Sequence, residues 1–198
     1  MGHGVTIDEV PTGVKPPVSI SAGLPVYFGT APINSVDLTN VNKPKLCETL
    51  ADFVTQFGPL SSDFASWTLH EAATAHFSVY SVAPIVCINV LDPNNAYHVG
   101  ILTGEANVLV NGSVQLEIYG ASGPLLGILQ STVVVRKGST LMTLGVDYTL
   151  AFDANGYLVV TIVVGGRLGA SDTILVDFHY LQPSGVTAND VIGAPGAR

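Results

Sequence analysis

Hydrophobic and polar residues are spaced differently on the two sides of residue 94. Before it, short apolar runs of strand length alternate with segments whose apolar residues follow the spacing of a helix. After it, from about residue 105 to 181, apolar residues occupy every second position between Gly, Asn and Asp turns, which is typical of antiparallel strands. The pattern therefore predicts an α+β protein that begins as an α/β layer and continues as a module of β-strands.

Residues 18–94 predict two strands separated by two helices. The apolar run at residues 24–30 suits a buried strand, and a loop is expected over residues 34–44. The continuous apolar run at residues 85–91 is typical of a strand that is covered on both faces in a parallel sheet. This order is the opening of an α/β layer, and two strands are too few to bury both of its faces.

The two helices carry signals of different strength. Thr49 stands three residues before Asp52, the spacing of a capping box, and Gly58 followed by proline is a stop signal. A helix is therefore expected over about residues 50–57. A second helix is expected after residues 61–63, and it ends before the proline that precedes the next strand.

The β-module is expected at residues 95–182. Asn111-Gly112 between alternating apolar residues is the strongest short signal for a hairpin, and the turn at residues 153–156 marks a second hairpin. Two more strands are expected at residues 133–136 and 174–180. Short strands at this regular spacing are typical of an antiparallel β-sandwich, which we interpret as an insertion into the α/β layer.

The first residues of the chain, 1–17, predict an extended arm. Apolar and polar residues alternate there with the period of a strand, and four Pro and Gly residues then exclude a helix. A strand this short needs a host sheet, so we expect it to be donated to a neighbouring subunit; the alternative is a frayed terminus. The residues expected to form this strand are Val5, Thr6, Ile7, Asp8, Glu9 and Val10.

The composition favours a surface that is covered by other proteins. Charged residues make up 11% of the chain, against about 25% in an ordinary soluble domain. Hydrophobic residues reach 47%, and the mean hydropathy is +0.46. No apolar run has the length of about 18 residues that a membrane-spanning helix needs, so membrane insertion is not expected. Burial against other subunits is the interpretation that remains.

Charge and cysteine usage narrow the possible partners and compartments. The formal net charge is −8, and no Lys or Arg occurs between Leu46 and Val135, which argues against a nucleic acid partner. Cys47 and Cys87 are isolated thiols inside apolar runs, so we expect them to be reduced and buried, with a disulfide as the less favoured alternative. No basic segment with an apolar core opens the chain, so export is not expected.

Motifs for catalysis or cofactor binding are not recognised in the sequence. His70 and Glu71 resemble the start of a zinc-protease helix motif, but Thr74 occupies the place of its second His. We expect no metal there, and instead one exposed His and one, His76, that packs beside Phe77. No catalytic residue, cofactor or metal is expected, and the protein is not predicted to be an enzyme.

Several stretches, in order along the chain, resemble contractile phage tail sheath proteins. The matching segments are residues 4–10, 19–25, 28–32 and 50–58 in the first part, and residues 145–150, 155–161 and 186–193 in the second. In the order of that family, residues 18–94 resemble the start of the subtilisin-like sheath domain and residues 95–182 its inserted β-sandwich. Residues 183–198 resemble the return linker, and the chain is expected to be the front portion of a longer architecture, because family members usually run more than twice as far.

The resemblance implies a structural function. Sheath subunits form hexameric rings that stack helically around the tail tube, linked by strand donation from the arm, and the sleeve contracts to drive the tube through the host envelope. The partners it implies are other sheath subunits, the tube protein, the baseplate and the tail terminator. It places the protein in the virion tail, and in the host cytoplasm before assembly. The alternative hypothesis is a β-sandwich module of a virion that binds a receptor or a carbohydrate.

Overall fold

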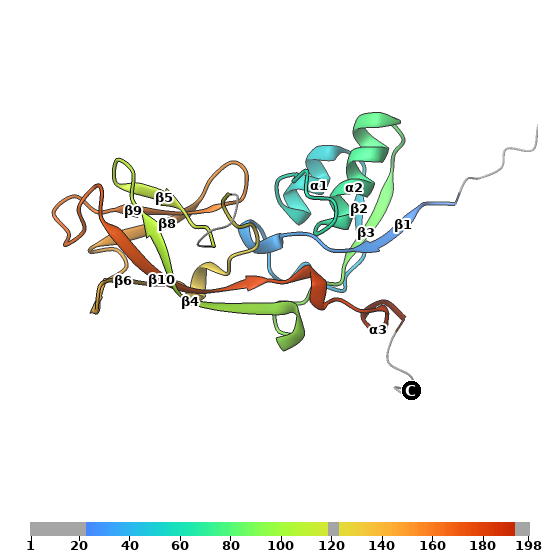
Figure 1. The fold of residues 1–198 in the computed structure, drawn as a ribbon. Helices are drawn as coiled ribbons and strands as arrows, with labels where there is room; N and C mark the ends of the chain where they lie inside the picture. Colours follow the sequence, from blue (N-terminus) through green and yellow to red (C-terminus); the bar gives the residue numbers. More distant parts are fainter. Residues whose placement is uncertain (1–22, 119–122, 193–198) are drawn as a thin grey trace, which may run out of the picture.

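The computed structural model describes residues 23–118 and 123–192, which form two parts that lie side by side (Figure 1). The α+β fold predicted from the sequence is confirmed. The first part contains β1 (Val26–Gly29), β2 (Lys45–Cys47), α1 (Leu50–Phe57), α2 (Thr68–Ala73) and β3 (Ile85–Asn89). The second part, the β-module, contains β4 (Val99–Val108), β5 (Ser113–Gln115), β6 (Val134–Lys137), β7 (Thr140–Leu141), β8 (Tyr148–Phe152), β9 (Leu158–Ile162) and β10 (Thr173–Leu181), and is followed by α3 (Ala188–Ile192).

The first part is built on a three-stranded sheet in the order β1-β3-β2. β1 and β3 are parallel, whereas β2 runs antiparallel to β3. The expectation that residues 85–91 lie in a parallel sheet is therefore wrong for one of the two neighbours. The antiparallel neighbour comes from residues just after the expected loop, and three residues of strand become recognisable only through their pairing with β3.

Helix α1 confirms the prediction from the capping box. The Thr49 side chain accepts a hydrogen bond from the backbone N–H of Asp52 at 3.1 Å, and the Asp52 carboxylate accepts one from the Thr49 N–H at 2.9 Å. The helix ends at Gly58, whose φ of 88° is a conformation that glycine adopts without strain. Phe53 and Phe57 point into the core from its buried face.

Helix α2 begins later than the sequence predicts. Residues 61–67 form turns instead, because the Asp63 carboxylate and carbonyl accept hydrogen bonds from the N–H groups of Ser66 and Trp67. From Thr74 to Val79 the helix continues as a π-helix and then ends before Pro84. Trp67, which precedes the helix, is buried.

The β-module is sandwich-like, as predicted. A four-stranded sheet in the order β4-β10-β6-β7 faces a three-stranded sheet in the order β5-β9-β8. Val176 and Phe178 of the first sheet and Leu158 and Val160 of the second belong to one buried cluster between them. The hairpin of β8 and β9 lies where the sequence places it. The hairpin expected at Asn111-Gly112 is wrong: only an isolated bridge between Val110 and Ser113 crosses this turn, because β4 pairs with β10 in one sheet and β5 pairs with β9 in the other.

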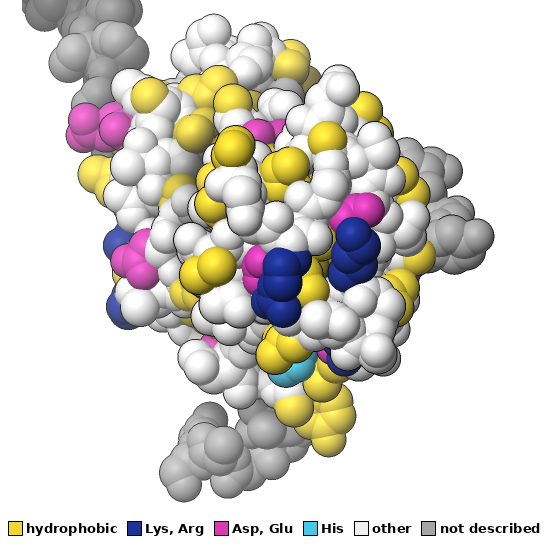
Figure 2. All heavy atoms as spheres, turned by 90° about the vertical axis from the view of Figure 1, so that its left-hand side faces the viewer, with side chains coloured by type: hydrophobic (Ala, Val, Ile, Leu, Met, Phe, Trp, Pro, Cys, Tyr) yellow, Lys and Arg dark blue, Asp and Glu magenta, His cyan; other side chains and the backbone are white. Residues whose placement is uncertain are grey.

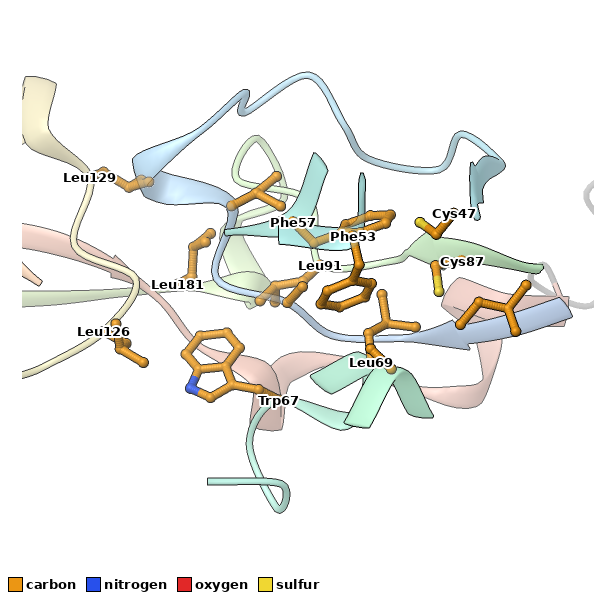
Figure 3. Packing of buried hydrophobic residues seen from close by; sticks show 14 residues of the cluster. Cys47, Phe53, Phe57, Trp67, Leu69, Cys87, Leu91, Leu126, Leu129 and Leu181 are labelled. Atoms are coloured by element: carbon orange, nitrogen blue, oxygen red, sulfur yellow. The ribbon is translucent and has the colours of Figure 1, made fainter. Parts of the chain in front are cut away.

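The two parts share a hydrophobic cluster at their contact (Figure 3). Leu126, Leu129 and Leu181 of the β-module pack with Trp67 and the side chains beneath α1 and α2. The Asn34 amide of the first part also donates to the Ile128 carbonyl at 3.3 Å. The boundaries at residues 94 and 182 remain predictions, since contacts of this kind occur both within and between domains.

The chain enters and leaves the β-module at one place, which we call the neck (residues 95–98 and 182–190). The N–H of Gln182 donates to the His98 carbonyl at 2.7 Å. Gly185 passes so close to the Tyr97 carbonyl that a Cβ at this position would overlap it. The buried His98 ring accepts from the N–H of Asp92 through Nδ1, and its Nε2 lies 3.4 Å from Asp190.

Candidate interaction surface

The sheet of the first part has one covered and one uncovered face among the described residues. Alternate residues of a strand point to opposite faces. Cys87 and Asn89 of β3 and Cys47 of β2 are buried on the side of the helices, where Gly29 of β1 leaves no room for a Cβ beside Thr68. Figure 1 shows α1 and α2 on this side of the sheet. The intervening residues of each strand therefore form the opposite face.

That opposite face, which we call the open face, consists of apolar side chains. The strand register aligns Val26, Val86 and Leu46 in one row across the sheet, and Phe28 and Ile88 in the next. Val26 and Phe28 are each 50% exposed and Leu46 is 51% exposed, while Val86 and Ile88 at the centre are half-buried. The expectation that residues 24–30 form a buried strand is therefore wrong, and so is the expectation that both faces of β3 are covered.

The reason for this difference lies in what an apolar run can indicate. A continuous apolar strand has two faces that avoid water, and the sequence shows this correctly. It does not show whether the layer that covers the second face belongs to the described part of the chain. A row of apolar side chains on an exposed sheet face is typical of a surface that contacts another protein.

Two sheet edges lie next to the open face. β1 and β2 are the outer strands, and in the part of the chain that the structure describes no strand pairs with their outer edges. Unpaired strand edges present N–H and C=O groups to which an extended segment can add. The arm strand predicted at residues 5–10 lies outside the described residues, so the structure does not test it.

The segment that returns from the β-module borders the open face. Phe28 and Val90 of the first part line a cavity together with Val186 and Val191 of this segment. In α3, Ile192 is 79% exposed. Apolar side chains thus continue from the sheet onto the short helix.

The histidines in the helical layer hold structural positions. His70 is fully buried, accepts a hydrogen bond from the Ser61 N–H at 2.9 Å and packs edge-on against Phe53. His76 bonds through Nε2 to the Tyr27 hydroxyl at 2.6 Å. The expectation of one exposed His is wrong, because His70 is fully buried and His76 is half-buried. Within residues 23–118 and 123–192 there is no group of three or more His, Cys, Asp or Glu residues arranged to hold a metal ion.

Burial changes the acid–base behaviour of His70. It lowers the pKa of the imidazole from its ordinary value of 6.5 to about 4, because the charged form loses its hydration. The Phe57 carbonyl, whose geometry falls short of a hydrogen bond to Nε2, offsets this effect only in part. The ring is therefore neutral at pH 7.

Both cysteines are buried and free, as the sequence predicts. They lie on neighbouring strands beneath α1 (Figure 3). The neighbouring Cys47 side chain, followed by burial, raises the pKa of the Cys87 thiol far above its ordinary value. Neither thiol has the exposed, electropositive surroundings of a reactive cysteine.

The far end of the β-module carries charges that are matched in pairs. Figure 2 looks onto this end and shows Lys and Arg side chains beside Asp and Glu. The buried Asp147 carboxylate accepts hydrogen bonds from the Arg167 side chain and from the N–H groups of Thr143 and Arg167. The Arg167 guanidinium, followed by these N–H groups, holds the pKa of the Asp147 carboxyl well below its usual range. These contacts fix loops and leave no net charge at the pair.

Comparisons with family models, with curated proteins and with solved structures found no match to the chain. None of the helices in the described residues combines the length and the hydrophobicity that crossing a membrane requires. The site is therefore argued from its own geometry. The open face, with the two strand edges beside it, is the surface on which the described strands present apolar side chains in aligned rows.

Proposed function

We propose that the protein is a structural subunit of a contractile tail sheath, in a phage or a phage-like particle, and that it functions by assembling with copies of itself. The observation that carries this proposal is the open face, on which Val26, Phe28 and Leu46 are about half exposed without a polar neighbour on the same rows. The order of the sheath-like segments along the sequence supports the choice of this family.

Burial of the open face supplies a driving force for assembly. Apolar surface removed from water contributes about 25 cal/mol per Å², and no charged side chain on these strand positions has to be desolvated with it. A chain with 11% charged residues and this face exposed gains solubility when other subunits cover it. Because each subunit in a sleeve repeats the contact, a modest gain per subunit becomes strong collectively.

The strand edges supply a second kind of contact. An extended arm that adds to an edge gains main-chain hydrogen bonds whatever its sequence, together with contacts from alternate side chains. In this proposal residues 5–10 of one subunit pair with the sheet of a neighbour and link rings that stack around the tube. The tube protein, the baseplate and the tail terminator are the other partners, and host-envelope penetration is the outcome of contraction.

The experiment places a charge on the open face. Phe28→Asp is expected to keep the circular-dichroism spectrum of the folded protein and to abolish rings or tubes in negative-stain electron microscopy, since an assembled subunit would have to bury the carboxylate unpaired. Val164→Asp is the matched control, because Val164 is 98% exposed on a loop of the β-module. Sedimentation velocity measures both variants against the unchanged protein.

Two results would contradict the proposal. If the Phe28→Asp variant assembles as well as the Val164→Asp control, the open face is not the interface between subunits. If the unchanged protein remains monomeric at every concentration, the protein does not self-assemble and the proposal is wrong. Deletion of residues 1–12 tests the arm separately, and we expect it to leave single rings that no longer stack.

A further inference from the structure

The contact between the two parts contains a small cavity lined by aromatic rings. Its volume is about 260 Å³. Its lining comes from the turns before α2, from the segment before Leu126, and from the end of β10. Three aromatic residues from distant parts of the sequence line it: Trp67, Tyr157 and Tyr180.

The sequence does not bring these rings together. Read from their alternation in the strands, Tyr157 and Tyr180 are expected to face the core of the sandwich. In the structure both are half-buried and line the cavity; Tyr180 also packs against the sandwich cluster, whereas Tyr157 packs against the cluster shared by the two parts. Trp67 reaches the same cavity from the first part, where Gly127 lies against its ring. Aromatic side chains of both parts therefore line one cavity, which neither part forms alone.

The polar groups of the cavity are rich in acceptors. Asp63 accepts one hydrogen bond from the Ser66 N–H through Oδ1 at 3.2 Å, and Ser61 Oγ accepts from the Asp63 N–H at 3.1 Å. The Gln182 amide group donates to Ser184, which leaves its carbonyl as a further acceptor at the cavity. Among the described residues, no Lys, Arg or His belongs to the lining.

From this chemistry we infer that the cavity binds a small organic cation, namely a quaternary or methylated ammonium group. Such a group is attracted by the negative faces of aromatic rings and is too weakly hydrated to resist transfer from water. A carboxylate at the rim adds an opposite charge, and the chain carries a net charge of −8. The volume is below the roughly 300 Å³ at which pockets for drug-sized ligands begin, so the ligand is a small head group.

Other ligand classes fit this lining less well. A phosphate or carboxylate ligand would meet Asp63 with no cationic partner in the lining. A purely apolar ligand would make no use of the negative charge of Asp63. A neutral sugar would satisfy the acceptors but would make no use of the charge, and it therefore becomes an outcome that the experiment separates.

The test compares choline chloride with the neutral alcohol in which carbon replaces the ammonium nitrogen. Trp67 is the only tryptophan in the sequence, so its fluorescence reports binding directly. Choline is expected to change the emission in a saturable way, and the neutral alcohol is expected to bind about tenfold more weakly, the effect of a desolvated cation–π contact. Glucose at the same concentrations serves as the sugar probe.

Variants locate the site. Asp63→Asn keeps the oxygen that accepts from Ser66 and removes only the charge, and it is expected to weaken choline binding about two- to fivefold, because the carboxylate is exposed. Asp37→Asn is its control, because Asp37 likewise accepts an N–H, that of Thr39, on an exposed turn outside the cavity. Tyr157→Leu is expected to weaken binding while thermal unfolding shows that the protein still folds, and Tyr80→Leu, at an exposed position, is its control.

Choline and a peptide with trimethyl-lysine carry the same group from different sources, and saturable binding of either supports the inference. The inference is overturned if neither binds, if the neutral alcohol or glucose binds as tightly as choline, or if Asp63→Asn has no effect. The test needs no assembled sheath, so its result is independent of the proposed function.

Discussion

The sheets of the β-module and the sheet of the first part differ in how their apolar faces are covered. In the β-module, two sheets face each other, and Phe178 between them is 1% exposed. In the first part, helices cover one face, and Phe28 on the other face is 50% exposed. Phe28 lies in β1 and Phe178 in β10, and both strands are rich in apolar residues. The difference teaches that apolar strands show how much surface has to be covered, and not which part of an assembly covers it.

The loops of the two parts are also stabilised by different kinds of contact. In the β-module, ion pairs such as Asp147 with Arg167 and Lys137 with Asp172 fix the loops far from the open face. In the first part, neutral groups do this work: Asn89 binds the backbone of Ala31 and Leu91, and His70 binds Ser61. Among the described residues, the ion pairs that involve Lys or Arg therefore lie in the β-module and not in the first part.

The largest effect is expected from truncating the two phenylalanines that define the comparison. Phe178→Ala should lower the free energy of unfolding by about 3–5 kcal/mol, because it leaves a cavity in a closed core. Phe28→Ala should lower it by about 1 kcal/mol or less, since half of the ring already meets water. Urea unfolding of dilute protein measures both. A loss at Phe28 as large as that at Phe178 would mean that the open face is covered in solution.

A somewhat smaller effect concerns acid stability and the first part. The folded pKa of His70, about 4, lies below its unfolded value of 6.5, so the unfolded state binds the proton more readily between these values. Stability is fully present above pH 6.5 and falls by roughly 3 kcal/mol as the pH drops to 4.

The substitution that tests this contribution is His70→Asn, which keeps an acceptor near the Ser61 N–H and cannot be protonated. It should flatten the loss of stability between pH 6.5 and pH 4, measured as urea midpoints across that range. If the variant loses stability over this range as steeply as the unchanged protein, the buried imidazole is not the group responsible.

The smallest effect is expected from removing the N-terminal cap of α1, a local contact in the first part. Thr49→Ala removes the side chain that caps α1 and should cost about 1 kcal/mol of stability. Thr55→Ala, on the exposed side of the same helix, is the control and should stay within about 0.5 kcal/mol of neutral. Thermal unfolding of both variants checks this, and equal losses would show that the cap contributes nothing beyond helix propensity.

How much of the fold the sequence predicts depends on how local the signal is. The capping box of α1 and the hairpin of β8 and β9 involve residues close together in the sequence, and both lie where they are expected. Strand β2 was missed because Lys45–Cys47 is a strand only through β3, about forty residues away. The late start of α2 is not predicted, because the Asp63 carboxylate and carbonyl accept the N–H groups of Ser66 and Trp67 and hold these residues in turns.

The candidate sites follow the same rule. The sequence shows the apolar content of residues 24–30 and 85–91, but the register that joins Val26, Val86 and Leu46 into one surface is a property of the folded sheet. The cavity with Trp67, Tyr157 and Tyr180 depends on the contact of the two parts. No spacing along the chain encodes that contact, so no motif was available to find it.

The neck has a mechanical consequence. Because Gln182 is bonded to His98, Gly185 lies against Tyr97 and Asp190 approaches His98, both connections of the β-module are clamped together at their base. Two connections that are bonded to each other in this way resist rotation of the β-module about the neck. Two separate flexible linkers would allow that rotation. A torque on the β-module is therefore transmitted into the sheet of the first part, and a small rotation of the sheet sweeps the far end of β10 through a larger arc, as in a lever.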